Sequence, residues 1–210
     1  LLGVRIECAQ CHHHPSERWS QTDYVGLAGF FTGVKLKKLP DGSQAIVSQG
    51  GRDLPHPRSG EVVTARALGA APAIFDGVTD RRQLLADWMV DRDNPFFARS
   101  IANRLWAHYL GRGVVEPIDD MRDTNPATNE PLLKALADHL HDVNFDLKAF
   151  TRTLLNSRVY QLSSRSNTSN RDDNQNFSHA AYKALPAEVL LDAISYSTGV
   201  PEKFNGWPQG

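Results

Sequence analysis

Two cysteines and a histidine near the start of the chain form the pattern Cys8-x-x-Cys11-His12. On a helical turn these three positions share one face. Two thiols at this spacing can add to the two vinyl groups along one porphyrin edge, and the adjacent imidazole can then reach the iron. The pattern is typical of covalent attachment of haem c, with Cys8 and Cys11 as attachment points and His12 as an axial iron ligand.

Three other interpretations of these cysteines stay open. A thioredoxin-like redox motif lies between a strand and a helix, and the neighbouring residues do not have that pattern. A structural zinc site usually takes its second pair of ligands from further along the chain, because four donors within about seven residues strain a tetrahedron. The zinc donors here would be Cys8, Cys11, His12 and His14. The last interpretation is a pair of buried thiols beside an exposed histidine run.

The second axial position of an iron held by His12 has no obvious methionine ligand. Met89 lies on an apolar helix face, and Met121 follows two aspartates. His14 is too close to His12 to reach the opposite porphyrin face, so it is left for another metal, a propionate or a local hydrogen bond. We therefore expect a five-coordinate or bis-histidine iron, with His108 as the first candidate for a distal ligand.

A second group of polar residues surrounds a helix end and a Gly-Arg-Gly turn at residues 111–113. Such a group could bind an anionic or sugar ligand or form a hydrolase site. The structural alternative is that Arg104 and Arg112 pair with aspartates in residues 119–123 and hold the turn. The group consists of Arg104, Trp106, His108, Arg112, Asp119, Asp120, Arg122 and Asn125.

The elements that must position these residues are mostly helices. Residues 1–31 have a helical pattern in two pieces around the cysteine motif, and a capping box of Ser20 and Asp23 predicts a helix over residues 21–31. Residues 32–79 contain short β-prone stretches between prolines and glycines, which indicates a hairpin plus an irregular linker.

The second half is a run of amphipathic helices with a period of 3.6 residues. Their expected N-terminal signals are Asp80, Asn94-Pro95, Asp146 and Pro186, with a further helix through Leu132 and Leu140. Gly111 and Gly199 are expected to end two of them. Residues 163–178 contain one large apolar residue, Phe177, which predicts a mobile loop.

Composition limits the function. The 23 basic and 24 acidic residues give a formal charge of -1, which disfavours nucleic acid and anionic lipid as partners. The mean hydropathy is -0.42, and no apolar run approaches the ~18 residues of a transmembrane helix. Two cysteines in one short window cannot form a disulfide framework. The chain opens on Leu1 inside an ordered-looking segment, so we expect an internal fragment of a longer protein.

Two stretches of the chain resemble known families. The first is similar to the end of the planctomycete-type cytochrome c domain of large multidomain proteins, through Gly3-Val4-Arg5-Ile6-Glu7-Cys8-Ala9-Gln10-Cys11-His12-His13-His14-Pro15, Trp19, Asp23-Tyr24, Gly26-Leu27-Ala28 and Phe30-Phe31. The second is similar to the partner domain of unknown function that follows it. It rests on Asn94-Pro95-Phe96-Phe97-Ala98-Arg99, Asn103-Arg104, Trp106-Ala107-His108, Gly111-Arg112-Gly113, Pro117, Asp119-Asp120, Asn125-Pro126, Phe145-Asp146-Leu147-Lys148, the run from Asn156 to Ser163, and the run from Leu185 to Ile194.

The resemblance implies a set of properties. Haem attachment carries over onto Cys8, Cys11 and His12, and His14 matches the pattern without a defined role. Ser16 stands where the family commonly has Phe, which changes a packing contact near the haem edge. Members are expected to be exported, in the periplasm or at the cell surface, and to work with an upstream cytochrome c domain or a redox partner protein.

We therefore expect a mainly α-helical fold with three parts. Residues 1–34 are the end of a cytochrome c-like domain with a helical haem-motif segment, residues 35–79 a β-containing linker, and residues 80–210 a multi-helix domain truncated at its carboxyl end. The expected function is electron transfer by a covalent c-type haem. The alternative is a non-redox binding or scaffold module, of a carbohydrate-associated kind, whose cysteine motif is structural or binds zinc. Whether the chain is an enzyme stays open.

Overall fold

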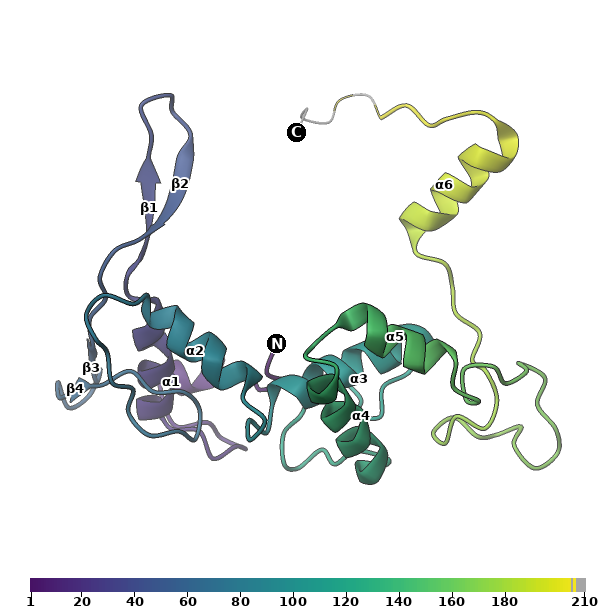
Figure 1. Ribbon diagram of the computed structural model, residues 1–210, viewed down its shortest axis with the longest axis horizontal. Helices are drawn as coiled ribbons and strands as arrows, with labels where there is room; N and C mark the ends of the chain where they lie inside the picture. The colour runs from purple at the N-terminus through teal and green to yellow at the C-terminus, as the bar shows by residue number, and fades with distance from the viewer. Residues whose placement is uncertain (205, 207–210) are drawn as a thin grey trace.

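The computed structural model describes residues 1–204 and 206. Residues 205 and 207–210, at the end of the expected domain 80–210, therefore lie outside the described part. The fold is mixed and mainly helical, as predicted, with two small antiparallel sheets (Figure 1). Its α-helices are α1 (Gln21–Ala28), α2 (Arg81–Val90), α3 (Phe97–Leu110), α4 (Glu130–Asp142), α5 (Leu147–Leu155) and α6 (Ala187–Thr198). Two 3₁₀ turns, η1 (Glu7–Gln10) and η2 (Gly29–Phe31), flank and extend the first helix. In the described residues, no helix has the length and apolar character needed to cross a membrane.

The helices begin where the sequence predicts, because their caps are local. Ser20 and Asp23 form the reciprocal capping box of α1. The carboxylates of Asp80 and Asp146 accept backbone N–H groups at the starts of α2 and α5. Asn94 lies two residues before the assigned cap of α3, but its Oδ1 still accepts hydrogen bonds from the first backbone amides, those of Phe96 and Phe97.

Two helices end at glycines, as expected. Gly111 follows α3 with φ of 85°, and Gly199 follows α6 with φ of 69°. This left-handed conformation costs glycine little because it has no Cβ.

The first half of the molecule has two small cores. In one, Ala9 of η1 packs with Trp19, Leu68 and Phe96, and the Trp19 and Phe96 rings meet edge to face at 5.9 Å. In the other, Phe30 packs with Ala65 and Ala67 and with Leu85, which lies on α2. Residues 65–68 of the segment 35–79 are thus core residues that join α1 to α2.

A hairpin of β1 (Val34–Lys38) and β2 (Gln44–Ser48) projects from this half (Figure 1). Its register places Leu36 opposite Ile46, and both side chains are exposed. A second short pair, β3 (Leu54–Pro55) and β4 (Val62–Val63), lies against α1. The expected hairpin is therefore present.

The second half is built on α3, α4 and α5, whose apolar faces enclose one larger core. Leu133, Leu140 and Phe150 are fully buried there. Residues 163–178 contain no helix or strand, in agreement with the sequence, and Phe177 packs against this core. Helix α6 stands away from the other helices and has no buried residue (Figure 1).

Candidate functional site

The cysteine motif forms one tight turn. Cys8 lies in η1, and the backbone amides of Cys11 and His12 both donate to the Cys8 carbonyl oxygen at 3.4 Å. The expectation of helical pieces on both sides is wrong for residues 1–6, which contain no helix. The reason is a tertiary contact, because the Gly3 carbonyl accepts a hydrogen bond from the Met121 amide at 2.8 Å.

The turn presents both thiols to solvent. Ala9, between them, is fully buried in the core around Trp19, and this anchor leaves Cys8 and Cys11 on the outside. Both cysteines are free and exposed. They are thus accessible to a reagent or a prosthetic group, and the interpretation as buried thiols is wrong.

His12 is exposed and its ring is oriented by one hydrogen bond. Its Nδ1 lies 2.6 Å from the carbonyl oxygen of His13. Because a carbonyl only accepts, Nδ1 is the donor in this contact, so in the neutral imidazole Nε2 has the free lone pair. In this tautomer Nε2 is the nitrogen available to a metal, and Nδ1 is held by a hydrogen bond of the kind usual for metal-ligating histidines.

The neighbouring histidines make local contacts. His14 accepts a hydrogen bond at Nδ1 from the Ser16 amide at 3.3 Å, and its own amide donates to the Trp19 carbonyl at 2.9 Å. His13 accepts at Nδ1 from the Gln21 amide at 3.3 Å. His14 therefore has the local hydrogen bond that the sequence left open to it.

The motif residues do not assemble a zinc site in this structure. Among residues 1–204 and 206, no three His, Cys, Asp or Glu side chains come together as a metal-binding group. The four suggested zinc donors, Cys8, Cys11, His12 and His14, are thus not converged on one point.

His108 lies far from this turn. Phe96, just before α3, packs with Ala9, whereas His108 is near the other end of the helix, about 18 Å further along its axis. It is exposed and lies edge to face with Tyr109 at 4.8 Å. The structure does not bring His108 to Cys8, Cys11 and His12.

The polar group of the second half has different partners from those expected. Asp119 pairs with Arg5 at 2.9 Å, and Asp120 pairs with Arg122 at 3.1 Å. Arg104 is exposed, and within the described residues neither it nor Arg112 forms an ion pair. The prediction that these two arginines pair with residues 119–123 is therefore wrong, because the arginine that reaches Asp119 comes from the distant start of the chain.

The turn after α3 is held by a residue that the sequence did not single out for this role. Asn103 is fully buried, and its Oδ1 accepts from the amides of Val114 and Val115 at 2.8 and 3.0 Å. Its Nδ2 donates to the carbonyls of Val115 and Ile118 at 2.9 and 3.1 Å. Asn125 adds bonds to the Glu116 and Asp120 carbonyls. Much of this polar group is therefore part of the scaffold, and Trp106 is buried.

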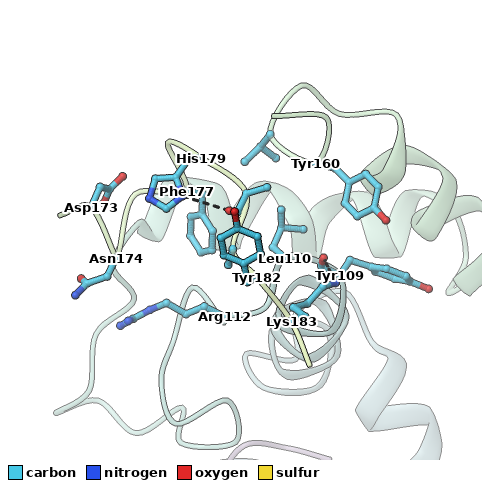
Figure 2. A pocket seen from close by; sticks show the side chains of 13 residues that line it. Tyr109, Leu110, Arg112, Tyr160, Asp173, Asn174, Phe177, His179, Tyr182 and Lys183 are labelled. Carbon is cyan, nitrogen blue, oxygen red and sulfur yellow. Dashed lines mark hydrogen bonds between the residues drawn. The ribbon is translucent and has the colours of Figure 1, made fainter. Parts of the chain in front are cut away.

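One member of that group, Arg112, lies in a cavity of about 670 Å³ (Figure 2). The cavity is bounded by the end of α3, by residues 159–160 and by residues 173–183. This cavity could not be predicted from the sequence, because its walls come from segments distant in the chain. Its side chains are Tyr109, Leu110, Arg112, Val159, Tyr160, Asp173, Asn174, Phe177, His179, Ala180, Ala181, Tyr182 and Lys183.

Comparison with known proteins gives two family matches. Residues 81–209, more than half of the chain, match PSD1, described as a protein of unknown function (DUF1553). Residues 1–36 match PSCyt2, also described as a protein of unknown function (DUF1549). Searches of curated proteins and of solved structures gave no significant match. Both matching families are families of planctomycete-type proteins, which agrees with that part of the resemblance noted in the sequence. The chain belongs to the PSD1 (DUF1553) family.

Proposed function

We propose that the turn of residues 8–12 carries a covalently attached c-type haem and that the chain is an electron-transfer module of a larger exported protein. The observation that supports this most is the state of three side chains: Cys8 and Cys11 are free and exposed on one turn, and the His12 ring has a free Nε2. When bound through such residues, haem supplies an iron that cycles between ferrous and ferric states.

The protein residues have separate roles in this proposal. Cys8 and Cys11 fix the orientation of the group through thioether bonds, and the hydrogen bond from His12 Nδ1 to the His13 carbonyl fixes the ligand imidazole. The buried Ala9 ties the turn to the protein core. The surface position of the turn allows approach by a redox partner protein or an upstream cytochrome c domain. Thioether formation takes place outside the cytoplasm, so the parent protein would be periplasmic or at the cell surface.

The test is production of the chain with a c-type maturation system and export. Haem is then measured by the pyridine haemochrome spectrum and by haem staining after denaturing electrophoresis. We expect haem to stay with the wild-type polypeptide. The haem staining should be weaker in Cys8→Ser and in Cys11→Ser, and it should be absent in the double variant.

His56→Ala is the control, because His56 lies outside the motif and its ring accepts hydrogen bonds only from the nearby amides of Arg58 and Ser59. It should keep haem attachment, whereas His12→Ala should change the optical spectrum of the iron. Absence of haem staining in the wild-type chain would overturn the proposal. So would stoichiometric zinc, measured by elemental analysis, that disappears in the Cys8→Ser variant.

A further inference from the structure

We infer that the cavity at the carboxyl-terminal end of α3 binds a small organic carboxylate with a ring-shaped body, and that Arg112 is its anion-binding residue. This inference does not depend on the haem proposal, because the cavity belongs to the second half of the chain. Its volume of about 670 Å³ lies in the range of pockets that enclose small molecules.

The walls of the cavity are tied to the helical core. The Phe177 ring meets the buried Trp106 ring edge to face at 5.2 Å. Lys183 Nζ donates to the carbonyl oxygens of His108 and Tyr109 at 3.2 and 2.6 Å, so it caps the end of α3. The Lys183 ammonium is therefore committed to the scaffold and is not the main binding charge.

The acidic residue of the cavity is also committed. The Asp173 carboxylate accepts hydrogen bonds from the backbone amides of Gln175, Asn176 and Ser178 at 3.0, 2.8 and 3.2 Å. The hydrogen bonds from Ser178 and Asn176 hold the pKa of Asp173 well below its usual range. The carboxylate is hydrogen-bonded within its own loop, and within the described residues it forms no ion pair with Arg112.

Arg112 is the uncommitted cation. Its Nε is buried and has no hydrogen-bond partner, and its guanidinium has no ion pair, both within the described residues. Because Nε is closed to solvent, the nitrogens that a ligand in the cavity can reach are Nη1 and Nη2, which are not buried and have no hydrogen bond within the described residues. The planar guanidinium fork matches a carboxylate, which can accept two parallel hydrogen bonds.

The rest of the cavity favours a ligand with a body rather than an inorganic anion. In the view of Figure 2, Arg112 and Asn174 lie at one end of the cavity, and Tyr109 and Tyr160 lie at the other. Phe177, Tyr160 and Tyr182 offer ring faces and edges between polar groups. Aromatic side chains of this kind pack against flat rings of either an aromatic acid or a sugar acid. An aromatic acid and a sugar acid share the carboxylate group, which is the part of the ligand that Arg112 would bind.

The experiment is calorimetric titration of the full 210-residue chain with four probes. The carboxylates are 4-phenylbenzoate and digalacturonate, and their neutral counterparts are 4-phenylbenzamide and the digalacturonate methyl ester. We expect at least one carboxylate to bind at least about tenfold more tightly than its neutral counterpart. Binding of only one of the two identifies the source as aromatic or sugar acid.

Two arginine variants separate the site from general charge effects. Arg112→Gln should weaken the carboxylate binding by at least about tenfold, and Arg112→Lys should restore only part of it, because lysine lacks the fork. Arg104→Gln is the matched control, since Arg104 is exposed and does not line the cavity. Circular dichroism and the melting temperature establish that each variant is folded.

Three results would overturn the inference. They are binding of neither carboxylate at millimolar concentration, equal affinity for acids and neutral counterparts, and equal losses in Arg112→Gln and Arg104→Gln. Should Arg112→Gln fail to fold, Tyr182→Ala provides a second test, because Tyr182 lines the cavity and is largely exposed. Unchanged affinity of that variant for the carboxylate would contradict the proposed occupancy.

Discussion

Gln21, the first residue of α1, donates a hydrogen bond from Nε2 to the carbonyl oxygen of Gln10, at 2.8 Å. The Gln21 residue is only 2% exposed. Its backbone amide also donates to His13, so the middle of the cysteine turn and the residue that follows it are both attached to the start of one helix. The position of Cys8 and Cys11 therefore depends on α1.

We predict that Gln21→Ala lowers the free energy of unfolding by about 1 kcal/mol, since one buried hydrogen bond is lost. The same variant should reduce the yield of covalent haem in the maturation experiment, because the turn is less well fixed. Urea unfolding and haem staining measure the two effects. Gln83→Ala is the control, because Gln83 makes an exposed hydrogen bond to Asp87 on α2. Equal effects of the two variants would contradict the prediction.

Asn103 should be one of the most sensitive positions in the second half. Asn103→Ala leaves two backbone amides and two carbonyls of residues 114–118 without their partner, and we expect a loss of about 3 kcal/mol or more. Urea unfolding measures the loss. Asn156→Ala removes a single exposed side-chain bond and should change stability by less than about 1 kcal/mol. A loss at Asn103 no larger than that at Asn156 would show that the turn is held in another way.

The ion pair of Arg81 and Asp53 predicts a pH dependence. The two side chains are 2.8 Å apart and only 15% and 26% exposed. Partial burial raises the pKa of Asp53, but the hydrogen bond and charge of Arg81 and the Ala65 amide outweigh it and hold the pKa below its ordinary value of 3.8. The stabilisation is thus fully present above the unfolded pKa and is lost as pH falls through the lower folded pKa.

The test of this pair is urea unfolding at pH 7 and at pH 3. Asp53→Asn should lower stability by about 1 to 2 kcal/mol at pH 7, and the difference from the wild type should shrink at pH 3. Arg81→Ala should keep part of its loss at pH 3, because Arg81 also lies over the Phe75 ring at 4.0 Å. Arg82→Ala, which breaks the exposed pair with Asp80, should lower stability less than Arg81→Ala does. A pH-independent difference for Asp53→Asn would contradict the linkage.

The sequence predicts those features of this fold that depend on near neighbours. The capping box of Ser20 and Asp23 and the glycine after α3 are decided within four residues, so the helix boundaries are legible. The exposure of the two thiols cannot be predicted in this way, because it depends on the packing of Ala9 against Leu68 and Phe96 from later in the chain.

The cavity and the ion pairs show the same limit. The partner of Asp119 is Arg5, more than 100 positions away, whereas spacing alone favours an arginine of the adjacent helix. The Gly-Arg-Gly turn suggests Arg112 as a candidate binding residue, but the aromatic wall of the cavity comes from residues 159–183. That wall has no periodic pattern, and tertiary contacts place it: the Phe177 ring against Trp106 and the hydrogen bonds from Lys183 to the end of α3.

The last prediction concerns that contact. Phe177 has a positive φ of 57°, which is uncommon for a residue with a Cβ, and its ring is held against Trp106. In Phe177→Ala the ring contact is lost, so residues 163–178 should open more often. Trypsin should then cut at the exposed Arg165 and Arg171 several-fold faster, because cleavage follows the population of the open loop. Electrophoresis over time, with mass spectrometry of the fragments, measures the rate and the sites.

Phe204→Ala is the control, since that phenylalanine is exposed and its loss should leave the cleavage rate unchanged. Equal cleavage rates in the wild type and Phe177→Ala, with both folded, would show that the Asp173 and Asn167 hydrogen bonds order the loop without the aromatic anchor.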